Sequence, residues 1–189
     1  MLLPLIDAIY WLSLATWFGC VLSCAVVPPI VLRVIREADP TLPRVLSVNL
    51  DKQHSVLLAG DVVGAILSTL FRLQAVCCVT FLPVLVVKWF TIDLSGQRIA
   101  MPILLSSLYV LAAAFMFYGW RIVWPKVLKH RQTYLDNADN PDIANAELDL
   151  FDRYSHELNA IVRNLLFASI GMLIFSAALR PVGISIISN

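Results

Sequence analysis

Long runs without charge alternate with charged segments along this chain, and the pattern predicts helices that span a membrane. The longest run has 25 residues between Asp7 and Arg33, and another of 22 residues lies between Arg98 and Arg121. A helix rises about 1.5 Å per residue and needs about 20 apolar residues to cross about 30 Å of hydrocarbon, so both runs are long enough. We predict spans at about 8–32 and 101–124.

Two shorter runs, each with a basic residue at both ends, predict two further spans. They have 15 and 16 residues and occupy 73–87 and 164–179. As helices they reach only about 22–24 Å, but the flanking Arg and Lys side chains can extend toward the lipid headgroups. Trp89 adds an aromatic anchor at the membrane interface. With these anchors included, we predict spans at about 73–90 and 161–180.

The distribution of Lys and Arg predicts the orientation of the four spans. The segments 33–72 and 125–160, with the Arg and Lys residues that bound them, carry eleven of these residues, whereas the rest of the chain carries three. By the positive-inside rule these two segments are cytoplasmic and both termini face the outer, periplasmic side. The first run lacks a basic start and is longer than the core of a signal peptide, so we expect it to remain as a span.

The fold class that follows is all-α. We expect one transmembrane domain, residues 1–189, built as an antiparallel four-helix bundle of an integral membrane protein whose helices extend into the cytoplasm. Residues 55–71 contain no proline, and they form either a continuation of the second span or a helix lying flat at the interface. Pro125 should end or kink the third helix.

The start of the last helix has a clear signal. Asn140, Pro141 and Asp142 provide an N-cap, a proline in the first turn and an acid at the positive helix end. An apolar stripe follows at steps of three and four residues: Leu148, Phe151, Tyr154, Leu158, Ile161 and Leu165. This spacing predicts one amphipathic helix that enters the membrane as the fourth span.

The composition agrees with a bilayer as the solvent. Hydrophobic residues make up 59% of the 189 residues and charged residues 14%, against about 45–50% and about 25% in soluble domains. The formal net charge is +1, so no overall positive field favours nucleic acid as a partner. We expect the lipid of a bacterial plasma (inner) membrane to surround the chain.

Two sets of small residues recur at four-residue spacing, and they are candidates for helix packing: Ala15, Gly19 and Ser23 in the first span, and Gly60, Gly64 and Ser68 before the second. Small residues at this period allow helices to approach closely in lipid. Packing within the chain and contact between two copies both fit the spacing.

Four cysteines lie in the predicted spans. Cys20 and Cys24 share a face of the first helix, whereas Cys77 and Cys78 are adjacent and point about 100° apart. Cysteine packs as a small buried hydrophobe, which is one interpretation of all four. The thiolates of Cys20, Cys24 and Cys77 could instead contact a soft cation such as Cu(I), so these three are candidate metal ligands.

Four polar residues near the predicted membrane boundaries are candidates for a polar site: Asp61, Arg72, His156 and Asn159. Ionisable groups near membrane depth are functional candidates because their burial is costly. Asp61 and Arg72 are eleven residues apart, or about 16 Å along a helix, so they cannot pair directly. A hydrogen-bonding role on the helix surface fits His156 as well.

The sequence contains no motif for an enzyme. A serine hydrolase site, a phosphate-binding loop and an HExxH metal site were sought without success. The three histidines, His54, His130 and His156, lie outside the predicted spans, so a haem held between membrane helices is not expected. We therefore predict a non-enzymatic protein without a cofactor.

Several short motifs resemble a known family. They are Trp17-Phe18-Gly19, Pro28-Pro29 with Arg33, Ala59-Gly60, Phe71-Arg72-Leu73, Trp120 with Pro125, and Phe151 through Asn159. Together they resemble the four-helix domain of unknown function shared by bacterial membrane proteins and the animal transmembrane protein 205 group. The segment from Tyr154 to Asn159 is more compressed than the family pattern. Animal relatives are linked to platinum-drug tolerance, so the resemblance implies an affinity for thiophilic ligands.

Two functions follow as expectations. The first is a non-enzymatic scaffold or subunit that associates with itself or with another membrane protein, as the small-residue faces and extended helices favour. The alternative is a transporter or binding protein for a small or thiophilic solute that uses Cys20, Cys24, Cys77 and Asp61. Four helices are few for an alternating-access carrier, so the alternative requires oligomers.

Overall fold

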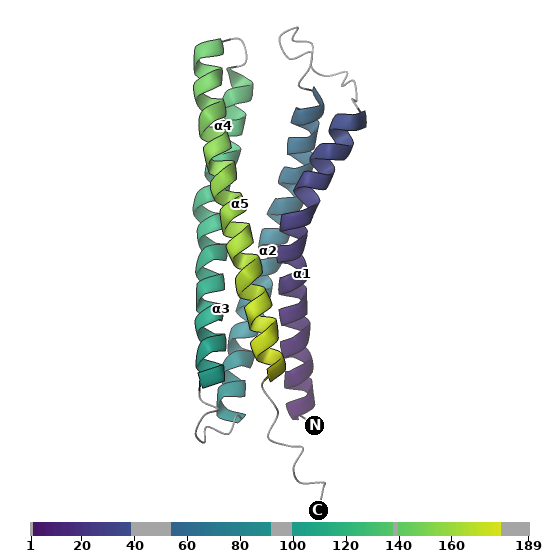
Figure 1. Ribbon diagram of the computed structural model, residues 1–189, viewed down its shortest axis with the longest axis vertical. Helices are drawn as coiled ribbons and strands as arrows, with labels where there is room; N and C mark the ends of the chain where they lie inside the picture. The colour runs from purple at the N-terminus through teal and green to yellow at the C-terminus, as the bar shows by residue number, and fades with distance from the viewer. Residues whose placement is uncertain (1, 39–53, 92–99, 138–139, 179–189) are drawn as a thin grey trace, which may run out of the picture.

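Every described element of the chain is helical. The computed structural model describes residues 2–38, 54–91, 100–137 and 140–178 (Figure 1). Its helices are α1 (Leu2–Ala38), α2 (His54–Thr91), α3 (Ala100–Tyr118), the π-helical segment η3 (Gly119–Val123), α4 (Trp124–Asp136) and α5 (Pro141–Ala178). The predicted spans lie within these elements, except for the end of the fourth, at 179–180, which is outside the described residues.

Four helical stretches are long and apolar enough to cross a membrane: Pro4–Ile35, Ala59–Phe90, Pro102–Asp136 and Pro141–Ala178. The predictions of an all-helical chain and of four candidate spans are therefore confirmed. Segment 39–53, and with it Arg44 and Lys52, lies outside the described residues, as do Arg98 and Arg180, so part of the charge distribution that predicts orientation is not placed.

Helix α2 decides between the two alternatives for residues 55–71. These residues continue without a break into the second candidate span, within one helix of 38 residues. Apolar residues occur around the whole circumference of this helix, as expected where one side packs on protein and the other meets lipid. Pro83 lies inside it, and a membrane helix tolerates such a proline where neighbouring groups satisfy the freed backbone carbonyl.

Of the two outcomes predicted for Pro125, an end of the third helix there is wrong. The helical path continues from α3 through η3 into α4, where Pro125 occupies the first turn. In the π-helical segment the backbone N–H of Trp124 donates to the carbonyl of Gly119, one residue further back than in an α-helix. Proline has no backbone N–H to donate. Because Pro125 follows this wider turn, its missing hydrogen bond does not fall in the middle of a regular α-helix.

The start of α5 is as predicted. It begins at Pro141, and the N–H of Ala144 donates to the Asn140 carbonyl at 2.9 Å. The N–H of Asn140 in turn donates to the Asn137 carbonyl at 2.9 Å, which joins α4 to α5 through a tight connection. Along the predicted stripe Leu158, Ile161 and Leu165 are buried and Phe151 and Tyr154 are half-buried, but Leu148 is exposed.

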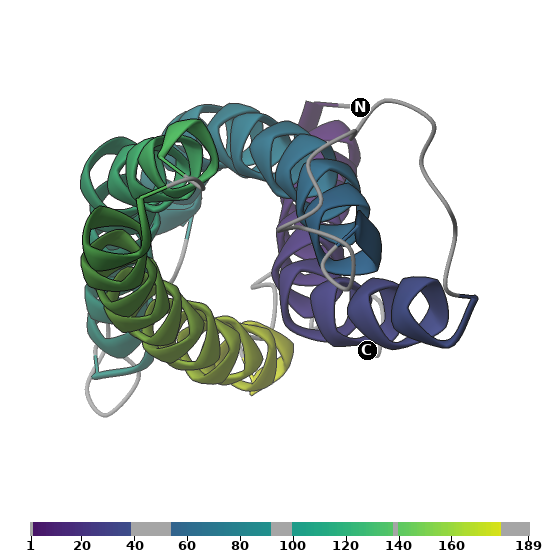
Figure 2. The same cartoon turned by 90° about the horizontal axis from the view of Figure 1, so that it is seen from above.

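The helices form two closely packed pairs. α1 lies along α2, and the α3–η3–α4 helix lies along α5. The colour gradient in Figure 1 shows that α1 and the α3–η3–α4 helix run one way along the long axis, whereas α2 and α5 run the other way. Seen from above in Figure 2, the four rods surround a common centre. α5 also packs on α1, and side chains join α2 to α3, where Tyr109 of α3 contacts Phe81 and Cys78 of α2.

The core lies where the pairs meet. Its largest fully buried side chains come from all four long helices: Tyr10, Leu14, Trp17, Phe71, Phe81, Leu105, Met116, Leu165 and Met172. Three rings pack at its centre, where the Tyr109 ring lies 5.8 Å from that of Trp17 and 5.3 Å from that of Phe81. Edge-to-face and tilted contacts of this kind favour one relative position of the helices.

Candidate functional site

A polar network joins three helices near the chain's N-terminus. Lys88 Nζ lies 2.9 Å from Asp7 Oδ1 and 3.9 Å from the centre of the Tyr10 ring. The Ser176 hydroxyl donates to the Met172 carbonyl at 2.5 Å, so the Tyr10 hydroxyl is the donor in its bond to Ser176 Oγ. We call Asp7, Tyr10, Lys88 and Ser176 the Lys88 network. It joins α1, α2 and α5 through groups that are mostly buried.

The four cysteines are free thiols, and all are buried at the contact of α1 with α2 or beside it. Gln74 Nε2 donates to Cys24 Sγ at 3.3 Å. The Tyr109 hydroxyl donates to the Cys78 carbonyl at 2.9 Å, which leaves the Cys78 thiol to donate to the Tyr109 oxygen at 3.4 Å. The thiol of Cys78 thus has a partner in α3.

Two buried polar atoms, one of them in the residue that bonds to Cys24, have no hydrogen-bond partner among the described residues. They are Gln74 Oε1 and Trp17 Nε1, and both side chains are about 99% buried. A buried unsatisfied carbonyl or N–H is costly, so each is a place where a guest molecule would be stabilised. Within the described ranges no group of three or more His, Cys, Asp or Glu residues is placed to hold a metal ion. Metal binding by Cys20, Cys24 and Cys77 stays a prediction.

The small residues predicted for helix packing have different surroundings. Ala15 is exposed, and at Gly19 and Gly64 an added Cβ would meet no atom of the described chain within 4 Å. Ser23 donates to the Gly19 carbonyl at 2.8 Å, and Ser68 accepts from Trp124 Nε1 at 3.2 Å. Gly60 has the close neighbour, because an added Cβ there would lie 2.8 Å from Arg131 Nε.

A second polar network lies at the opposite end of the molecule, and the sequence analysis did not predict it. His130 Nδ1 lies 2.6 Å from Glu147 Oε2, and the imidazole stacks on the Tyr154 ring at 5.3 Å with an interplanar angle of 12°. Arg131 Nη1 donates to Asp61 Oδ1 at 2.8 Å. We call Asp61, His130, Arg131, Glu147 and Tyr154 the His130 network. It joins α2, α4 and α5.

The other predicted polar residues do not meet in one place. Asp61 pairs with Arg131 of α4 rather than with Arg72 of its own helix, and Arg72, His156 and Asn159 are exposed. The pairing of His130 with Glu147 had a signal in the sequence. The two residues are equally distant from the connection at 138–139, so an antiparallel helical hairpin brings them level.

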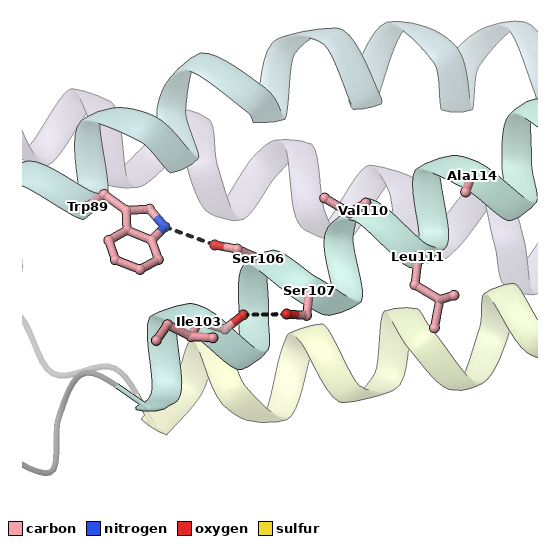
Figure 3. Close-up of a pocket in the computed structure, with 7 residues that line it drawn as sticks. All are labelled: Trp89, Ile103, Ser106, Ser107, Val110, Leu111 and Ala114. Atoms are coloured by element: carbon pink, nitrogen blue, oxygen red, sulfur yellow. Dashed lines mark hydrogen bonds between the residues drawn. The ribbon is translucent and has the colours of Figure 1, made fainter.

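An open groove lies on α3 beside the end of α2, and Figure 3 shows its residues. Its volume is about 570 Å³, and it is lined by Trp89, Ile103, Ser106, Ser107, Val110, Leu111 and Ala114. Trp89 Nε1 donates to Ser106 Oγ at 2.8 Å, and Ser107 Oγ donates to the Ile103 carbonyl at 2.9 Å. Because the chain itself satisfies these polar groups, the groove offers mainly apolar contact.

Comparisons with protein-family models, with curated proteins and with solved structures give no match to this chain.

Proposed function

We propose that this chain is a multi-pass protein of the plasma (inner) membrane that acts as a non-enzymatic scaffold or subunit. In this proposal its helices form an antiparallel transmembrane bundle, both termini face the periplasm, and α4 with the adjoining parts of α2 and α5 extends into the cytoplasm. Its partners are lipid and either a second copy or another membrane protein.

The observation that carries the proposal is the change in exposed residues along the helices. The middle part exposes large apolar side chains, among them Val79, Val110 and Phe167, each at 64–70% of its full area. Beyond Arg121 the exposed residues of α4 include the charged Lys126 and Lys129, beside the apolar Leu128. An apolar belt followed by a charged helical hairpin supports a protein that is anchored in lipid and offers a surface to partners.

The His130 network supports the scaffold role because it fixes the hairpin. His130 and Glu147 join α4 to α5, and Arg131 joins α4 to α2, so the charged surface is held in one orientation. A surface held rigidly before binding loses less conformational freedom when a partner binds.

The test is the mass of the particle after gentle extraction from the native membrane. We expect a defined assembly heavier than the 21.1 kDa chain, which is lost when Asp149 and Asp152 on the exposed face of α5 are replaced by Lys. Asp149→Glu with Asp152→Glu is the matched control, since it keeps the charge at the same exposed positions. A strict monomer with specific solute flux in liposomes would refute the scaffold. A tag after Asn189 found on the interior side would refute the orientation.

We also propose membership of the family related to the transmembrane protein 205 group. Of the motif residues that carry the resemblance, Trp17 and Phe71 are fully buried core residues and Trp124 beside Pro125 packs on Phe71 at 6.2 Å. Motifs that form a shared core are expected to recur among relatives with the same fold. A solved structure of a family member with a different helix order would refute membership.

A second candidate function, binding of a small or thiophilic solute, is favoured by Gln74. Its Oε1 has no partner in the described chain although the side chain is buried beside Cys24. Replacing Cys20 and Cys24 by Ala should abolish stoichiometric Ag(I) binding, measured by elemental analysis of purified protein. Cys78→Ala is the control, because that thiol already bonds to Tyr109. Equal silver content in all three proteins would refute this candidate.

A further inference from the structure

The last third of α1 exposes apolar side chains at a level where each of the other helices also exposes charged ones. Val26, Ile30 and Val34 are 44–56% exposed and follow one another at four-residue spacing, so they form one stripe. We call these three residues the α1 stripe. Arg33 beside it is exposed as well.

Contacts between the helices fix the level of the α1 stripe. Cys24 of α1 lies level with Gln74 of α2, because Sγ and Nε2 are 3.3 Å apart. The two helices run in opposite directions (Figure 1), so counting along the sequence from this contact makes Val26 level with Arg72 and Ile30 with Ser68. Ser68 in turn accepts from Trp124, which begins α4.

At this level the other three helices carry exposed charged or polar residues. Ile122 of η3 and Leu128 of α4 are exposed there as well, but the charged or polar residues are Arg72 on α2, Lys126 and Lys129 on α4, and Arg153 and His156 on α5. These residues identify the zone where α2, α4 and α5 leave the apolar belt. The α1 stripe therefore extends the apolar surface of one helix past the boundary of its neighbours.

The sequence contains the same asymmetry. The uncharged run in α1 has 25 residues, whereas the run between Arg72 and Lys88 in α2 has 15, a difference of about 15 Å along a helix axis. Pro28 and Pro29 lie inside α1 just where the stripe begins, and prolines are a common cause of bends in helices. Figure 1 shows the corresponding end of α1 leaning away from α4 and α5.

We infer that the α1 stripe binds phospholipid of the cytoplasmic-side leaflet, so that α1 stays in contact with acyl chains for about two turns after the other helices have left them. The inference rests on the membrane assignment proposed above. Lipid is the occupant because the stripe continues the exposed apolar surface of Leu12 and Leu22 without an intervening charge. Arg33 is placed to extend toward a lipid phosphate from the same helix end.

The experiment compares thiol labelling at matched positions in the full chain. Single variants V26C, I30C and V34C are reconstituted in vesicles of phosphatidylcholine and phosphatidylglycerol, and permeabilised vesicles are treated with a polar maleimide. K129C and R153C are the matched controls, because both positions carry exposed charged side chains on α4 and α5 near the same level. The parent chain gives the background, since its four cysteines are buried.

We expect the stripe positions to react at least about tenfold more slowly than K129C and R153C, because a thiol in hydrocarbon does not form the reactive thiolate. V110C, exposed in the middle of α3, should react as slowly as I30C. If I30C is labelled rapidly while V110C is protected, the contact of the α1 stripe with lipid is overturned but the membrane assignment is not. Rapid labelling of V110C would overturn the membrane assignment itself.

A second measurement separates lipid from a protein that covers the stripe. A fluorophore attached at I30C should be quenched by nitroxide-labelled phospholipid to the same degree as one at V110C. The ratio should not change when the vesicles are diluted to one copy each. A protected I30C without quenching, or protection lost on dilution, would show a protein cover such as a second copy and would overturn the inference.

Discussion

The two ends of the molecule hold their helices together with polar contacts of different kinds. In the Lys88 network the cation is 17% exposed and lies between a carboxylate and the face of a fully buried tyrosine. In the His130 network the carboxylate of Asp61 is 70% exposed, against 46% for Asp7, although Arg131 is 17% exposed like Lys88 and the side chains of His130 and Glu147 are only 16% and 22% exposed. Water and salt weaken an exposed ion pair, whereas a partly buried one is costly to break. We therefore expect the first end to be fixed, and the contact of α2 with α4 through Asp61 to be the adjustable part of the second end.

Removing the cation from the Lys88 network should have the largest effect. Lys88→Met keeps the length of the side chain but loses the charged bond to Asp7 and the cation–π contact with Tyr10. We expect the free energy of unfolding in mixed micelles to fall by about 2–4 kcal/mol. Lys129→Met, at an exposed position on α4, is the control and should change it little. An equal fall in the free energy of unfolding for both variants would show that the Lys88 network does not hold its end more firmly than an exposed lysine does.

Within the His130 network, the largest loss should follow from His130→Ala. The variant leaves Glu147, whose side chain is 22% exposed, without the imidazole and removes the ring stacked on Tyr154. We expect a loss of about 1–2 kcal/mol and faster proteolysis between α4 and α5. His156→Ala, which removes an exposed histidine of the same helix pair, should leave both quantities unchanged. A larger loss than that of Lys88→Met would reverse the comparison.

Breaking the exposed pair itself should matter less. Asp61→Asn keeps the shape and one acceptor oxygen for Arg131, and most of the lost attraction was screened by water. We expect a fall of less than about 1 kcal/mol, which shrinks further when salt is raised. The measurement is the same unfolding titration at two salt concentrations. An effect that does not depend on salt would show that this pair behaves as a buried one.

Sequence alone predicted the helices well because the features that a membrane helix requires lie within a short stretch of the chain. An uncharged run of sufficient length, as in α1, and a cap such as Asn140 followed by Pro141 can be recognised within a few residues. The path through Pro125 could not be predicted, because the π-helical turn that accommodates it depends on packing. Gly119 within that turn lies against Ile161 of α5, where an added Cβ would be 3.1 Å from the Ile161 side chain.

The polar contacts were harder to predict because they depend on how neighbouring helices are rotated. Asp61 was singled out from its position near a membrane boundary, but its partner Arg131 is 70 residues away and on another helix. Lys88 was interpreted only as a flanking cation, since nothing local indicates that Tyr10 lies beneath it. His130 and Glu147 are the exception, because a short connection between two helices fixes which residues are level.

The smallest effects should come from two glycines of α2, and they test whether the second end adjusts as proposed. Gly64→Ala adds a methyl group where nothing lies within 4 Å, so the gain in helix propensity should raise stability by up to about 1 kcal/mol. Gly60→Ala makes the same gain but places Cβ against the Arg131 guanidinium, which must move. Because that group is the far end of a flexible side chain, we expect the net change to be close to zero. Unfolding titrations of both variants, alone and combined with Asp61→Asn, measure the difference. The decisive comparison is made in the Asp61→Asn background. A free energy of unfolding that is still lower for Gly60→Ala than for Gly64→Ala would show that α4 packs rigidly on α2 and that the second end is as fixed as the first.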